Sequence, residues 1–191
     1  MLLKRVAAAW LASLGLLAAG CSREAPTPTI NESMTQVMQP QAQTIWDITS
    51  HAFNDKGDGL DASKLTAGDW AQLEKAGQAI RDRALVLANA KHVTVAKSDE
   101  AIMGQDASHG GVKKTWDAAS VSQVQGLIDA NPSGFAQHAQ VLAQAGDTVV
   151  KASQTKDAAM LYGVSSNLDE VCDGCHQPFW GTDEPPPFPG K

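Results

Sequence analysis

The sequence predicts an all-α protein whose helices pack as an antiparallel four-helix bundle. Apolar residues recur every three or four positions along four segments, which is the spacing of one helical face. No stretch alternates apolar and polar residues as a half-buried strand would. The connections are short or moderate, which suits antiparallel neighbours, and 191 residues suit a single domain. We therefore expect one helical domain over residues 30–180.

The first two helices are indicated by apolar stripes on either side of a Gly- and Asp-rich connection at residues 54–63. Pro40 falls inside the first stripe, where it removes a backbone hydrogen bond and can kink the helix. Thr66 is a suitable N-cap for the second helix. The first stripe is Met34, Val37 or Met38, Gln41, Ile45, Ile48 and Ala52, and the second is Trp70, Leu73, Gly77, Ile80, Ala84 and Leu87.

The second half of the chain begins with residues 91–115, which lack periodicity and predict a long loop. A short helix is expected at 121–130, Pro132 suits the start of the third long helix, and Asp157 suits the N-cap of the fourth. The third stripe is Phe135, Leu142, Ala145, Val149 and Ala152, and the fourth is Leu161, Val164, Leu168, Val171 or Cys172, and Cys175. The Pro-rich tail at 181–191 cannot continue a helix, and we expect it to be disordered.

Residues 1–20 are typical of a targeting segment, with Lys4 and Arg5 before a short apolar stretch. The segment ends in Leu-Ala-Ala-Gly-Cys21, which resembles a bacterial lipoprotein signal, although its Leu lies one position earlier than usual. We expect Cys21 to become the lipidated N-terminus and residues 21–29 to form a tether. The alternative is an ordinary secretory signal with a chance Cys. Ser22 is not Asp, and the rule for such signals then favours the outer membrane, with the domain facing the periplasm.

The chemistry of the chain is concentrated in the run Cys172-Asp173-Gly174-Cys175-His176. In a Cys-x-x-Cys-His segment the two sulfurs reach the two vinyl groups of one haem, and the adjacent His reaches its iron. A zinc site would need two further ligands, and the five His are scattered without ligand spacing. A redox dithiol would sit in a βαβ pattern, which is not seen. The sequence therefore predicts one covalent haem c.

This attachment segment, continuing to Pro178-Phe179-Trp180, is similar to that of the class II cytochromes c, the cytochrome c-prime group and its low-spin relatives. The resemblance covers roughly residues 30–180, because these proteins carry the motif near the C-terminus of a four-helix bundle. It implies His176 as the proximal iron ligand. One departure is that Ile30, Asn31 and Glu32 stand where the family usually has a basic residue on the first helix.

The sixth iron position decides between two functions. Antiparallel packing should bring the start of the first helix to the haem, and Met34 is the candidate distal ligand, with Met38 behind it. Thioether ligation implies a low-spin electron carrier, whereas an open position implies a sensor or scavenger of nitric oxide or carbon monoxide. We expect that the protein is not an enzyme. Other candidate ligands are His51, His92, His109 and His138, and the residues expected to shield the haem edge or fill the core are Trp46, Trp70, Trp116 and Trp180.

The charge of the chain limits its partners. The formal net charge is -6, and removal of Lys4 and Arg5 would make it more negative by two. An acidic chain without a basic patch is a poor nucleic-acid binder, so the expected partners are a redox protein and the membrane reached by the anchor. The family resemblance also implies a homodimer through the first two helices, where small residues would let helices approach. The alternative is that these residues, Ala71, Ala76 and Ala90, pack inside one bundle.

Overall fold

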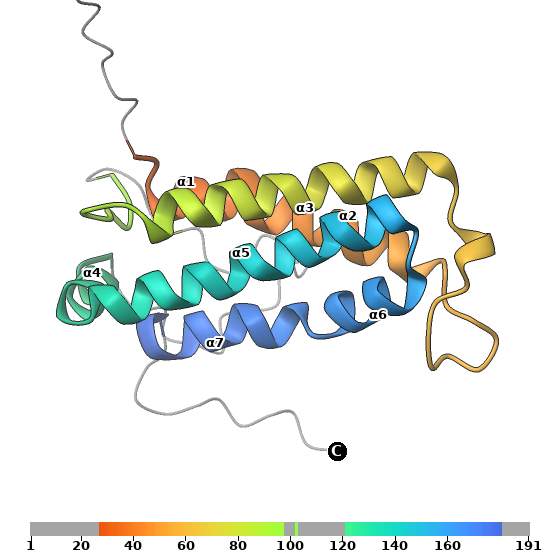
Figure 1. Ribbon diagram of the computed structural model, residues 1–191. Helices are drawn as coiled ribbons and strands as arrows, with labels where there is room; N and C mark the ends of the chain where they lie inside the picture. The colour runs from red at the N-terminus through yellow and green to blue at the C-terminus, as the bar shows by residue number, and fades with distance from the viewer. Residues whose placement is uncertain (1–26, 98–101, 103–120, 181–191) are drawn as a thin grey trace, which may run out of the picture.

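A computed structural model describes residues 27–97, 102 and 121–180 of the chain (Figure 1). Every secondary-structure element in these ranges is a helix. The one β-type pairing among the described residues is an isolated bridge between Phe53 and Leu60. The prediction of an all-α protein is therefore confirmed. The helices are α1 (Ile30–Ser33), a π-helix (Met34–Met38), α2 (Gln39–Ser50), a short 3-10 helix (Ala62–Lys64), α3 (Ala67–Ala88), α4 (Val121–Ala130), α5 (Pro132–Thr155), α6 (Ala158–Ser166) and α7 (Leu168–Trp180).

The first helix runs without a break from Ile30 to Ser50, but its second turn is π-helical. Thr29 caps its start in a capping box with Glu32. The π turn ends in a bond from the Gln39 N–H to the Met34 carbonyl, five residues back. Pro40 follows directly, and it has no N–H to donate while its ring crowds the carbonyl four residues earlier. The disturbance predicted at Pro40 is therefore a π-helical segment.

The longest helices, α3 and α5, lie side by side along much of their length (Figure 1). Their backbones meet at two glycines. A Cβ built on Gly77 would lie 2.7 Å from the Gly146 carbonyl oxygen, and one on Gly146 would lie 2.7 Å from the Gly77 carbonyl oxygen. Around this crossing the second predicted stripe is buried throughout and the third is buried except for the partly buried Leu142, with Leu73, Ile80 and Val149 at the centre of the core. The remaining helices pack around this pair.

The last helix departs from the prediction. The sequence indicated one helix from Asp157 onward, and the structure has two, α6 and α7, separated at Asn167. The backbone there has φ of -102° and ψ of 1°, which leaves the helical region. The Asn167 side-chain amide donates to the Gly163 carbonyl at 3.0 Å, in place of a regular helical bond. Asp157 caps α6 as predicted, since its carboxylate accepts the Met160 N–H.

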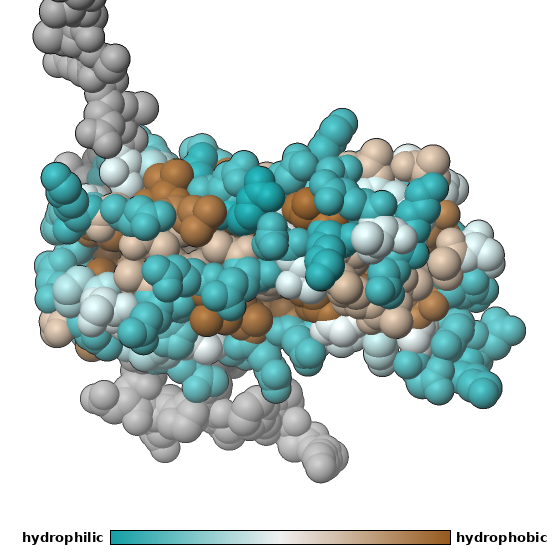
Figure 2. All heavy atoms as spheres, viewed as in Figure 1, coloured by the Kyte–Doolittle hydropathy of each residue, from teal (hydrophilic) through white to brown (hydrophobic). Residues whose placement is uncertain are grey.

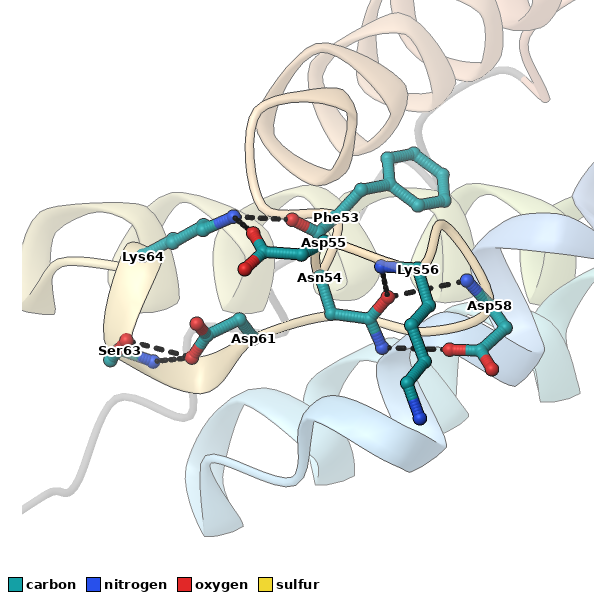
Figure 3. A network of polar contacts seen from close by, with 8 residues as sticks. All are labelled: Phe53, Asn54, Asp55, Lys56, Asp58, Asp61, Ser63 and Lys64. Carbon is teal, nitrogen blue, oxygen red and sulfur yellow. Dashed lines mark hydrogen bonds and ion pairs between the residues drawn. The ribbon is translucent and has the colours of Figure 1, made fainter.

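Side chains of the connection between α2 and α3 form hydrogen bonds with its own backbone (Figure 3). The Asn54 side-chain oxygen accepts the N–H groups of Lys56 and Asp58, and the Lys64 ammonium donates to the Phe53 carbonyl at 2.7 Å. Gly57 has φ of 73°, a left-handed conformation that suits glycine. This connection lies at the opposite end of the molecule from α4 (Figure 1). It therefore has no part in the site described below.

The small residues considered for a dimer interface have different surroundings. Ala76 is fully buried in the core, Ala71 is exposed and Ala90 is partly buried. At Ala76 the small side chain therefore serves packing within one chain. On the face seen in Figure 2, hydrophobic side chains form small patches separated by hydrophilic ones. The homodimer stays a prediction.

The crossing at Gly77 gives a test of the fold. Gly77→Ala should lower the free energy of unfolding by about 1–3 kcal/mol, because the added methyl would press on the backbone of α5. The matched control is Gly126→Ala on α4, where nothing lies within 4 Å of the added Cβ. There the substitution should raise the free energy of unfolding by about 0.5–1 kcal/mol. Urea unfolding measures both, and equal effects of the two variants would contradict the crossing.

Candidate functional site

The predicted attachment segment lies on α7, the C-terminal helix of the domain. The three-residue spacing places Cys172 and Cys175 on successive turns of one side of the helix. Both are partly buried free thiols, and His176 is partly buried beside them. The two intervening residues, Asp173 and Gly174, are exposed. The helix thus turns its three predicted haem-binding residues toward the protein and the two residues between the cysteines toward solvent.

A small cavity lies where α7 meets the start of the first helix. It measures about 20 Å³, which is room for a water molecule. Met34 and His176 both line it, so the start of the first helix and α7 border one cavity. Whether Met34 binds iron stays a prediction. The complete lining is Ile30, Met34, Val124, Ile128, Phe135, Cys175, His176 and Phe179.

Two phenylalanines form the aromatic part of this wall. The rings of Phe135 and Phe179 pack edge to face with their centroids 5.7 Å apart. The tryptophans were expected to shield a haem edge or to fill the core, and those whose side chains the structure describes do not line the cavity. Trp70 is buried in the core, and the Trp46 indole N–H donates to the Ser165 carbonyl at 3.3 Å. Trp116 lies outside the described residues.

The electrostatics of the site favour neutral side chains. Burial, followed by the charges of Asp169 and Asp173, raises the pKa of the Cys172 thiol to about 11. Burial, followed by Cys172, raises the pKa of Cys175 to about 11. Burial also lowers the pKa of His176, against the opposing effect of Asp173. Around neutral pH the folded chain therefore holds two thiols and a neutral imidazole, and the neutral imidazole is the form that binds a metal.

The alternative ligands lie elsewhere. Met38 is buried in the core, one turn beyond Met34. His138 on α5 packs its ring against the edge of Phe179, with centroids 6.0 Å apart, but it does not line the cavity. His51 is exposed at the end of α2, and His92 lines a second cavity with Asp129. Both His109 and the lipidation candidate Cys21 lie outside the described residues.

Several residues of the site were not identified from the sequence. Val124 and Ile128 come from α4, whose short apolar pattern gave no sign of facing α7. Ile30 occupies the stretch where the family resemblance led us to look for a basic residue. The structure brings an arginine to that region from another helix, because Arg83 on α3 places its Nη1 atom 3.4 Å from the Ser33 hydroxyl. Only spatial packing reveals these neighbours.

The residues present suit a covalent haem in their chemistry. Two thiols one turn apart and a neighbouring neutral imidazole are the donors that such a group requires, and the thioether across the apolar space is a suitable second iron ligand. The cavity itself holds only about one water molecule, so the porphyrin would take its room by moving the apolar side chains apart. The site therefore fits haem by its donors and its apolar walls, and it fits by volume only after local opening.

Among the residues that the structure describes, no group of three or more His, Cys, Asp or Glu is placed to hold a metal ion by itself. A haem iron needs only one or two protein ligands. Within the same ranges no helix is both long and apolar enough to cross a bilayer. Comparison of the chain with models of protein families, with curated proteins and with solved structures found no match.

The buried thiols predict an alkaline instability of the haem-free protein. Their pKa is raised in the folded state from the ordinary 9.0 to about 11. The protonated thiols therefore stabilise the folded chain fully below pH 9.0, and this stabilisation is lost as the pH rises through about 11. Urea unfolding on either side of this interval should show a marked fall in stability. The Cys172→Ala/Cys175→Ala variant should lose less stability over the same interval. An identical pH dependence in the two proteins would contradict burial of the thiols.

Proposed function

We propose that this chain is a monohaem c-type cytochrome that transfers electrons in the bacterial envelope, built as a four-helix bundle. One observation carries the proposal. A single apolar cavity joins Cys175 and His176 of the Cys-x-x-Cys-His segment to Met34, 142 positions away from His176 in the chain. A Cys-x-x-Cys-His segment on an exposed loop would support the same assignment less strongly. Here both its imidazole and a thioether face one water-poor space.

Each residue would have a distinct part in this function. The haem, when bound, supplies a one-electron couple at its iron. Cys172 and Cys175 would hold the porphyrin through thioether bonds, and His176 would bind the iron from the same helix. Met34 would supply a second protein ligand to the iron, and its soft sulfur would favour the ferrous state and raise the reduction potential. Apolar walls such as Ile128 and Phe135 would exclude water and lower the local dielectric constant.

The second candidate function is binding of a neutral diatomic gas. It is favoured by one feature, the purely aliphatic part of the wall formed by Ile30, Val124 and Ile128. If Met34 leaves the sixth position open, this wall would admit nitric oxide or carbon monoxide. Peroxidase chemistry is less well supported, because it requires a distal acid–base pair. Cys175 and His176 are the titratable residues of the cavity as described, and both belong to the attachment segment.

The proposed location follows from the leader alone. Cleavage before Cys21 and lipidation of its sulfur would tether the domain to the membrane, with the outer membrane favoured and the haem facing the periplasm. Several acyl chains make such an anchor stable, since a single chain gives only marginal binding. The redox partner would then be another envelope protein that reaches the domain from the periplasm.

Intact mass tests the central proposal. Protein extracted from envelope membranes should begin at Cys21, carry a diacylglyceryl group and carry one haem that stays attached through acid–acetone extraction. The Cys172→Ala/Cys175→Ala variant is the control, and its haem, if any, should leave with the solvent. A wild-type mass without haem would overturn the proposed function. A haem-bearing mass without lipid would overturn only the proposed anchor.

A matched pair of volume-conserving variants tests the sixth ligand. Met34→Leu should abolish the weak far-red band of a ferric His/Met haem, lower the reduction potential and open the ferrous iron to carbon monoxide. Met38→Leu removes the same thioether from the core, at a cost of less than about 1.5 kcal/mol in stability, and should leave all three properties unchanged. A wild type that is already high-spin and binds carbon monoxide freely would favour the gas-binding function.

A further inference from the structure

The segment at residues 93–97, which we call the strap, lies against the start of the first helix. The Ile30 N–H donates to the Thr94 carbonyl and the Asn31 N–H donates to the Val95 carbonyl, both at 2.9 Å. These N–H groups belong to the first turn of α1, where a helix has no internal acceptors for them. An ion pair between Lys97 and Glu32 adds a further contact. The strap thus completes the end of the helix that carries Met34.

The strap is in turn held by one side chain from α4. The Val95 N–H donates to the Gln125 side-chain oxygen at 2.9 Å, and the Gln125 side-chain nitrogen donates to the Val93 carbonyl at 2.9 Å. The same nitrogen donates to Asp129 on the next turn of α4, also at 2.9 Å. Gln125 therefore pairs with the backbone on both sides of Thr94, much as a neighbouring strand would.

The strap is also buried where these bonds form. Val93, Val95 and Ala96 are 7%, 0% and 6% exposed. Inside such an environment a backbone N–H or carbonyl that loses its partner cannot easily find water. If the Gln125 amide were removed, the Val95 N–H and the Val93 carbonyl would lose their partner. The strap would then move outward, because in that position the two groups can bind water. The first turn of α1 would then lose the two acceptors that the strap supplies.

We propose that Gln125 is a positioning residue that holds Met34 in the cavity opposite His176. It acts through the strap and the first turn of α1, since Met34 follows Ile30 by one helical turn and both line the cavity. Gln125 itself does not line the cavity, although its neighbour Val124 does. This inference rests on the proposed function, because it concerns the occupancy of a haem iron's sixth position. Its consequence is that the choice between electron carrier and gas binder depends on an amide outside the haem pocket.

The main variant is Gln125→Met in the full-length holoprotein. It keeps the length of the side chain and removes every hydrogen bond that the Gln125 side chain makes. Hydrogen exchange at the Ile30 and Asn31 amides should accelerate by about tenfold. The apparent affinity of the ferrous protein for carbon monoxide should rise by about tenfold, because the state without Met34 on the iron becomes more populated. The far-red ferric band should weaken in parallel.

Two further variants make the result specific. Gln140→Met on the exposed face of α5 is the control for the substitution itself, and it should change none of the three readouts. Gln125→Glu keeps the acceptor for the Val95 N–H but sets a carboxylate oxygen against the Val93 carbonyl and Asp129, so its effects should be at least as large as those of Gln125→Met. The same order of effects in exchange, affinity and spectrum supports positioning.

The contrary outcomes are distinct. Accelerated exchange in Gln125→Met with an unchanged band and carbon monoxide affinity would make Gln125 purely structural and overturn the proposal. Unchanged exchange would overturn the link through the strap. A wild-type haem without Met34 ligation would overturn the positioning role while leaving covalent attachment intact. A chain that carries no haem would overturn the proposed function, and exchange at Ile30 and Asn31 in that haem-free chain would still support or overturn the link from Gln125 to the first helix.

Discussion

The contact of the α3 and α5 backbones is the constraint on which the other helices depend. Gly77 and Gly146 have no side chains to separate them, so each carbonyl oxygen occupies the space that a Cβ of the other residue would need. The Met34 side of the candidate site is held from α3, and the His176 side is held from α5. The strap that holds α1 continues from the end of α3, and α7 packs on α5. A small change in the crossing would shift Met34 relative to His176.

Much of this fold could be predicted from the sequence because its signals are local. The stripe from Trp70 to Leu87 is buried as expected, and Thr66 and Asp157 cap their helices. The break at Asn167 was missed, since the apolar spacing continues through it and the side chain only later competes for the Gly163 carbonyl. The strap was missed for the opposite reason. It has no periodicity, and its bonds to residues 30 and 31 exist only between segments far apart in the chain.

The residues of the candidate site also differ in whether a local sequence signal identifies them. Cys172, Cys175 and His176 lie within five consecutive residues, so a motif identifies them before any packing is known. Val124 and Ile128 belong to a helix whose place could not be derived, because the chain before it gave no pattern. Burial then adds what a motif cannot supply. It raises the pKa of both thiols, an effect that the charges of Asp169 and Asp173 reinforce at Cys172. It lowers the pKa of His176 against the opposing effect of Asp173, so the site disfavours charge.

Under the proposed function, the proximal side of the haem would be fixed by covalent bonds within one helix, and loosening the tertiary packing would leave it intact. The distal side would depend on hydrogen bonds that run from Gln125 to the strap and from the strap to α1. Because Val93 and Val95 are buried, a substitution that removes the Gln125 amide leaves their backbone groups without a partner. The sixth position would therefore be the part of the site most easily altered by substitution, while the haem itself stays attached. Two chains with the same attachment segment could differ in function through residues that never touch the haem.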